Sequence, residues 1–100
     1  MRKTAKNTNQ TTTKRDLERL TKKITMLRKK ADSENRVGGD IDMAEACTQD
    51  AKDLAAIHKM IAAGKLAKAG NAAYDLDTAA RDEIPIRLFN TIMAAAGFCN

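Results

Sequence analysis

The sequence has few of the residues that build sheets and aromatic cores. Aromatic residues make up 3% of its 100 residues, tryptophan is absent, and Val37 is the one valine. Strands are rich in β-branched and aromatic residues in alternating patterns, so this composition argues against a substantial sheet. Because helix-forming residues dominate instead, we expect an all-α fold. At this length it would be a small bundle of three to four helices in one domain.

The chain is also poor in residues for metal binding and covalent catalysis. Cys47 and Cys99 lie far apart, and His58 is the single histidine. Zinc sites need about four ligands at short spacings, which this sequence lacks. No glycine-rich phosphate-binding motif occurs, and Asp75 and Asp77, two residues apart, diverge on a helix. We predict no enzyme, no metal site and no cofactor, with Cys47 in the core and His58 as a buried or half-buried structural residue.

Long apolar runs are missing as well. The longest uninterrupted one, around residues 92–99, is far shorter than the ~20 residues that a membrane span needs. The N-terminus is charged and polar, without the apolar segment of a secretory signal. We therefore expect a cytoplasmic protein without membrane insertion.

What the chain does have is a strongly uneven distribution of charge. Residues 1–30 hold eleven lysines and arginines and two acids, which gives a net charge of +9. Residues 31–100 hold seven lysines and arginines and eleven acids, which gives a net charge of −4. Such a split is typical of a segment that interacts with a polyanion. The candidate nucleic-acid-binding residues are Arg2, Lys3, Lys6, Lys14, Arg15, Arg19, Lys22, Lys23, Arg28, Lys29 and Lys30.

The basic third divides into two parts. Residues 1–12 are polar and offer almost nothing to bury, which predicts a flexible basic arm ahead of a single helical domain over 13–100. Thr13, followed by Asp16, has the pattern of a helix start and predicts a helix over about 13–33. The apolar residues of this helix recur at spacings of three and four, which is typical of a narrow seam between two helices.

The charges beside that seam limit how the first helix can pack. In a parallel homodimer Lys23 and Arg28 would face each other across the seam and repel. We therefore expect the helix to pack antiparallel, either on the second helix of its own chain or on a partner subunit. The second helix is rich in acids, so an antiparallel hairpin would pair unlike charges.

Glycines and capping residues place the remaining helices. Gly38-Gly39 predicts a turn, after which Asp40 or Asp42 can cap a helix over about 41–63. Gly64 and Gly70 interrupt the next stretch, and Asn71 can cap a third helix over about 72–82. A fourth helix is expected over about 85–96, with its proline in the first turn and a glycine after its end.

A short chain with a core of Ala, Leu, Ile and Met would gain stability from a second copy, so we expect a homo-oligomer, with a dimer favoured. The fourth helix is apolar over more than one face, which suits either a central core helix or a subunit interface. The candidate interface residues are Leu17, Leu20, Ile24, Leu27, Leu88, Phe89 and Ile92.

Two functions of different classes fit these patterns. The first is a small regulatory or accessory protein that binds nucleic acid through its basic arm and first helix. Phosphate contacts to a duplex are expected, because the basic third has no aromatic residue to stack on single-stranded bases. The alternative is a helical regulator or inhibitor that docks on an acidic protein partner, like the accessory and anti-defence proteins of mobile elements.

Overall fold

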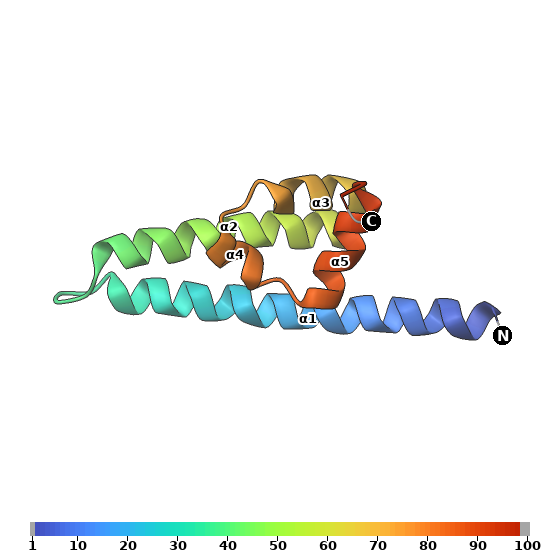
Figure 1. Ribbon diagram of the computed structural model, residues 1–100. Coiled ribbons are helices and arrows are strands. Elements are labelled where there is room, and N and C mark those ends of the chain that lie inside the picture. The colour runs from blue at the N-terminus through green and yellow to red at the C-terminus, as the bar shows by residue number, and fades with distance from the viewer. Residues whose placement is uncertain (1, 99–100) are drawn as a thin grey trace.

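Residues 2–98, which the computed structural model describes, form five helices and no strand, and side chains are described for residues 14–98. The helices are α1 (Arg2–Glu34), α2 (Ile41–Ala62), α3 (Leu66–Tyr74), α4 (Thr78–Asp82) and α5 (Ile86–Ala95). α1 and α2 lie side by side as an antiparallel hairpin, and the other three helices pack over part of it (Figure 1). The predicted all-α fold is therefore confirmed, and so is the hairpin.

The turn between α1 and α2 depends on a glycine and two carboxylates. Gly38 has a φ of +86°, which glycine adopts without strain. The Glu34 carboxylate accepts from the backbone N–H of Asp40 at 2.8 Å. Asp40 in turn caps α2, because its carboxylate accepts from the N–H of Met43 at 3.1 Å. The predicted break is confirmed, Asp40 rather than Asp42 is the cap, and α1 packs on the second helix of its own chain.

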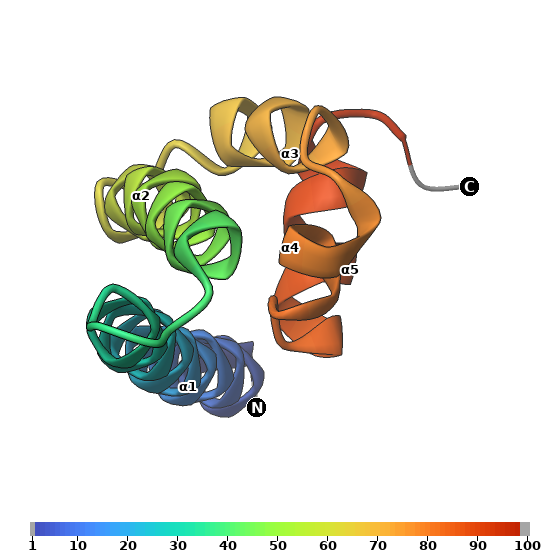
Figure 2. The same cartoon turned by 90° about the vertical axis from the view of Figure 1, so that its left-hand side faces the viewer.

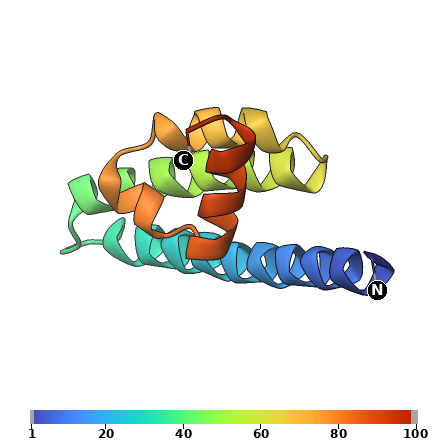
Figure 3. The same cartoon turned by 45° about the vertical axis from the view of Figure 1, so that its right-hand side comes forward.

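The N-terminal part of α1 differs from the prediction. The helix begins at Arg2 rather than near residue 13, so the backbone of the expected flexible arm continues α1 beyond the ends of the other helices (Figures 1 and 3). No glycine or proline interrupts residues 2–34. Once a packed helix exists, each added residue gains a hydrogen bond without a new nucleation step. The start signal at Thr13 is too weak to stop that extension.

The predicted helix over 72–82 is wrong, because two helices occupy this region. α3 runs through Gly70 and Asn71, where the sequence suggested a break and a cap. The chain breaks instead after Tyr74. Asp77 then caps α4, its carboxylate accepting from the N–H of Ala80 at 2.9 Å.

Close packing explains why Gly70 lies inside a helix. It is buried against α5, and a Cβ at this position would collide with the backbone carbonyl of Ile92 and lie 2.7 Å from the Cβ of Ala96. The glycine therefore permits a close approach of two helices rather than ending one. Viewed along the hairpin, α3 lies next to α2 and α5 descends from it towards α1 (Figure 2).

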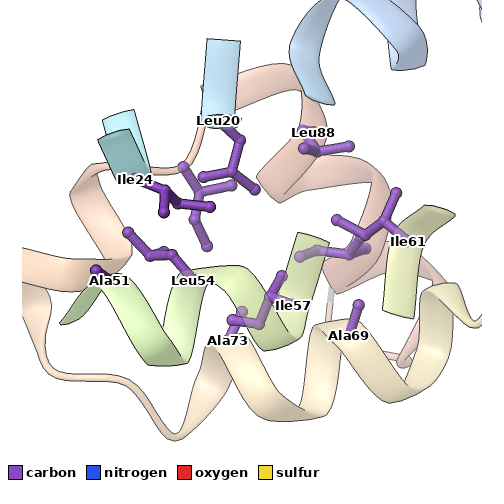
Figure 4. Packing of buried hydrophobic residues seen from close by; sticks show 11 residues of the cluster. Leu20, Ile24, Ala51, Leu54, Ile57, Ile61, Ala69, Ala73 and Leu88 are labelled. Carbon is purple, nitrogen blue, oxygen red and sulfur yellow. The ribbon is translucent and has the colours of Figure 1, made fainter. Parts of the chain in front are cut away.

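The fourth predicted helix is confirmed as α5. Pro85 precedes its first residue, and Gly97, with a φ of +86°, follows its end. The core forms where α5 and α3 meet the hairpin, and Leu20 and Ile24 of α1 lie close to Leu54 of α2 there (Figure 4). The largest side chains that are no more than 1% exposed are Leu20, Leu54, Ile57, Leu88 and Ile92.

The residues that the sequence suggested as a subunit interface pack in or against this core. Four of them, Leu20, Ile24, Leu88 and Ile92, are buried within the single chain. The remaining three, Leu17, Leu27 and Phe89, are half-buried against the same core. The residues pack within one molecule because α2 supplies the antiparallel partner for the α1 seam. Cys47 is buried as predicted, and Cys99 lies outside the described residues.

Candidate nucleic-acid interface

The structure places the basic side chains of α1 on its outer surface. The candidates whose side chains are described are all exposed: Lys14, Arg15, Arg19, Lys22, Lys23, Arg28, Lys29 and Lys30. Arg2, Lys3 and Lys6 lie on the N-terminal part of α1, and their side chains fall outside the described residues. Seventeen residues of α1, from 14 to 30, therefore present eight cations to solvent.

Five of these cations form two ridges. Lys14 and Arg28 are fourteen residues apart on α1, with Thr21 midway. The next ridge is made by Arg15, Lys22 and Lys29, at a spacing of seven. Seven residues are close to two helical turns, so members of a ridge point the same way at intervals of about 10.5 Å. Because their positions differ by one residue, the two ridges lie about 100° apart around the helix axis.

A hydrogen bond between α1 and α2 shows where these ridges lie on the hairpin. The Thr21 hydroxyl donates its one hydrogen to the carbonyl of Leu17 at 3.0 Å. The same hydroxyl also lies within hydrogen-bond distance, 3.0 Å, of His58 Nε2 on α2. His58 is half-buried, as predicted, and joins the two helices. The ridge that contains Thr21 consequently runs along the α1–α2 seam.

Two exposed lysines of α2 lie on one face of that helix, which they share with the acid Glu45 at spacings of seven. Lys59 follows His58 directly, and Lys52 lies seven residues earlier on the same face of α2. Both are exposed. We call the combined surface the basic face: Lys14, Arg15, Lys22, Arg28 and Lys29 of α1 with Lys52 and Lys59 of α2.

Sequence reasoning missed the two lysines of α2. That helix was treated as acidic because of its net charge, and net charge does not show on which face each residue lies. The seven-residue spacing of Lys52 and Lys59 was the signal that could have found them. The helical period determines which residues share a face. One face can therefore carry basic side chains on a helix whose net charge is negative.

The predicted pairing of α1 bases with α2 acids is not found. Among the described side chains, no ion pair joins α1 to α2. The pairs that involve α1 are Arg19–Asp16 within the helix, at 3.7 Å, and Lys23–Glu83 to the residue after α4, at 3.9 Å. The bases of the basic face therefore remain available to solvent or to a polyanion.

The acids of α2 lie elsewhere, which explains the missing pairs. Partial burial raises the pKa of Asp50 above its ordinary value, and the charges of Asp77, Asp53 and Glu83 raise it further. These neighbours place the middle of α2's acidic side against α4 rather than α1. The acids near the start of α2 are exposed beside the turn.

The remaining cations of α1 line a groove on another side of the molecule. This groove, of about 720 Å³, lies between α1 and the α4–α5 connection. Arg19 and Lys23 line it, and Lys30 follows Lys23 by seven residues, which places it on the same flank. At the α1 wall Asp16 is buried and pairs with Arg19. Lys22 of the basic face also lines this groove. The predicted cations thus fall on two surfaces that share Lys22, and the described ion pairs of α1 involve Arg19 and Lys23 rather than the basic face.

Within the described part of the chain, no three cysteine, histidine or acidic side chains come together as a metal-binding group. No helix in that part has the length and apolar character that a membrane crossing requires. Comparison with known protein families, with curated proteins and with solved structures found no match to this chain. Functional inference therefore depends on the arrangement of the side chains.

Proposed function

We propose that this chain is a small, non-enzymatic protein that binds duplex nucleic acid through its basic face. The observation that carries this proposal is that the α1–α2 hairpin exposes seven cations, none of which has an ion-pair partner among the described side chains. The contact between Thr21 and His58 fixes α1 against α2 at the centre of that face. The cations are therefore held in a constant relative arrangement rather than on a flexible segment.

The geometry suits contacts to the phosphate backbone. The ridges repeat at about 10.5 Å along α1, and packed helices lie about 8–10 Å apart. A two-helix face of this size can reach phosphates on both sides of a groove about 12 Å wide. Each phosphate neutralised releases condensed counterions, which supplies most of the affinity in non-specific binding.

The residue types indicate limited sequence reading. Five of the seven cations are lysines, which bind phosphate as point charges, and two are arginines, which can form bidentate contacts. No aromatic residue belongs to the basic face, so it has no platform on which single-stranded bases could stack. Phosphate contacts to a duplex of any sequence are the expected mode.

The primary experiment measures binding of the full chain to an unrelated duplex by fluorescence anisotropy, between about 50 and 200 mM salt. We expect affinity to fall steeply as salt rises, because each contact to B-DNA contributes about 0.9 to the slope of log K against log salt. A protein that does not bind duplex at the lowest salt would refute the proposed function.

A pair of variants tests the face itself. Lys52→Gln with Lys59→Gln removes two charges from the basic face, and Arg36→Gln with Lys68→Gln removes two exposed charges outside it. The first variant should weaken binding and reduce the salt slope by about 1.8, which is two contacts at about 0.9 each. The second should leave the slope near that of the original chain. Equal losses in both variants would mean that total charge, not this face, governs binding.

A further inference from the structure

The exposed apolar residues of this protein are not scattered. Seven large apolar side chains are exposed in the described part of the chain. Two of them, Tyr74 and Phe98, stack on each other with ring centroids 4.4 Å apart. The other five gather in two places, the α1–α2 turn and the groove beside α4 and α5. Two separate apolar patches on one small chain call for a physical explanation.

The first patch lies at the hairpin tip, which we define as residues 32–45. Val37 is fully exposed there, Ile41 is 61% exposed and Met43 is 40% exposed. The same segment carries five of the eleven acids in residues 31–100. Arg36 is the one base of the tip, so the tip has a net charge of −4. Its five acids are Asp32, Glu34, Asp40, Asp42 and Glu45. The tip is therefore both apolar and acidic.

The second patch lies in the groove, where Met26 of α1 is 63% exposed and Ile86 of α5 is 69% exposed. Lys22 and Arg87 also line this groove, and neither has an ion-pair partner among the described side chains. Phe89 adds a half-buried aromatic surface. Five cations and three acids line the groove, which gives its lining a net charge of +2. The cations are Arg19, Lys22, Lys23, Arg81 and Arg87, and the acids are Asp16, Asp82 and Glu83. The groove is therefore apolar and basic.

We propose that the hairpin tip of one copy of this chain docks into the groove of a second copy. Val37 and Ile41 would contact Met26 and Ile86, with the tip acids facing the two unpaired groove cations. The tip cannot enter its own groove, because α1 and α2 are rigid helices that hold it at the far end of the hairpin (Figure 1).

The contact is heterologous, since the two docking surfaces are different parts of the chain. A copy that gives its tip keeps a free groove, so association continues head to tail into a closed ring or an open filament. The elongated shape, 57 × 23 × 19 Å, favours such end-to-side growth. Lys22 belongs to both the groove and the basic face, but the association needs no ligand and is therefore measured in the absence of nucleic acid.

Sedimentation velocity and light scattering on the full chain, without nucleic acid, test the proposal. The mean mass should rise with protein concentration from the 10.9 kDa of one chain, and high salt should reduce it because the tip and groove carry opposite charge. Two variants block one surface each. Val37→Asp with Ile41→Asp alters the tip, and Met26→Glu with Ile86→Glu alters the groove. All four side chains are exposed, so folding should be retained, as circular dichroism would verify.

Mixing the two variants gives the decisive result. Each alone should remain monomeric, whereas an equimolar mixture should form dimers of twice the monomer mass, because one intact tip then meets one intact groove. Tyr74→Ser serves as the control, since it removes an exposed apolar side chain outside both patches and should associate like the original chain.

Three outcomes would overturn the proposal. An original chain that stays monomeric at its solubility limit would leave the groove to a different protein. Association that persists in both blocked variants would place the contact on other surfaces. Loss of association in both variants without recovery in the mixture would exclude a tip-to-groove contact.

Discussion

The two halves of the α1–α2 hairpin are built differently, although the same pair of helices forms both. Near α3, α4 and α5 the hairpin buries large side chains, such as Leu20, Leu54 and Ile57. We call this the covered half. Towards the turn the hairpin has no third layer (Figure 1), and its buried residues are small: Ala31, Ala44 and Cys47. We call this the open half.

The difference shows what a two-helix seam can bury alone. Two helices exclude water only along the narrow line between them, which suits small side chains at close approach. A leucine or isoleucine needs neighbours on more sides, and α3 and α5 supply them in the covered half. Stability should therefore concentrate in the covered half, leaving the open half and its tip free to carry exposed functional groups.

The largest expected effect comes from truncating the covered core. Leu54→Ala should lower the free energy of unfolding by about 2–5 kcal/mol, because it leaves a cavity among side chains that cannot fully collapse. Small domains are stable by only about 5–15 kcal/mol, so this is a large fraction of the total. Urea unfolding followed by circular dichroism measures it.

The matched substitution in the open half is Cys47→Ala. It removes one buried atom from the seam and should cost about 1 kcal/mol, close to the value of one buried methylene. Equal losses at Leu54 and Cys47 would contradict the distinction between the two halves.

Gly70→Ala tests the layer that covers the hairpin. An alanine would favour the α3 helix by about 1 kcal/mol, but its Cβ would collide with the Ile92 carbonyl. We expect overpacking to prevail, with a net loss of about 1–2 kcal/mol in the free energy of unfolding. Ala67→Gly, at an exposed position of α3, measures the helix-propensity contribution alone. A stabilised Gly70→Ala variant would show that α3 and α5 can move apart.

The same glycine marks the limit of sequence-based prediction for this fold. Gly38, Gly64 and Gly97 all have positive φ and do end or link helices, as their positions in the sequence suggest. Gly70 looks identical in the sequence, but it serves a contact with a helix more than twenty residues away. Local patterns therefore predicted the α1–α2 turn and α5 correctly and failed for α3, whose path is set by a distant neighbour.

The candidate site shows the same limit. The sequence indicated the basic residues of α1, because a charge block is visible without a structure. It could not separate the side chains of the basic face from Lys23, which the fold brings to Glu83 at the residue after α4. Lys52 was overlooked for a related reason. Whether it belongs to the same surface as the α1 cations depends on which side of α2 packs against α1.

Substitutions at two helix-capping residues, one in each half, should change the free energy of unfolding by smaller amounts. Asp40 caps α2 at the open end, and Asp77 caps α4 against the covered half. Asp40→Ala should cost about 1 kcal/mol of unfolding free energy, the usual value of an N-cap. Asp77→Ala should cost less, because it also removes a negative charge that lies near Asp50. Thermal unfolding of both variants at pH 7 measures the difference, and a larger loss for Asp77→Ala would contradict it.

The smallest effect concerns the pH dependence of Asp50. Its raised pKa means that the folded chain holds this proton more tightly than the unfolded chain does. The ionised carboxylate therefore reduces stability at neutral pH, and this penalty disappears as pH falls through the raised pKa and below the unfolded value of about 4. Asp50→Asn should stabilise the protein at pH 7 by a few tenths of a kcal/mol, the scale of partly exposed charges, and lose that advantage at low pH.

Asp42→Asn is the counterpart in the open half and should change stability in the opposite direction at pH 7. Asp42 lies in the first turn of α2, where a negative charge interacts favourably with the helix dipole. Urea unfolding of both variants at pH 7 and near pH 3.5 separates the two effects. If Asp50→Asn destabilised the protein at pH 7, the acids between α2 and α4 would not repel one another, and the α2 acids would have to be paired with cations after all. The basic face would then be less available to a polyanion, so this small electrostatic measurement also bears on the proposed function.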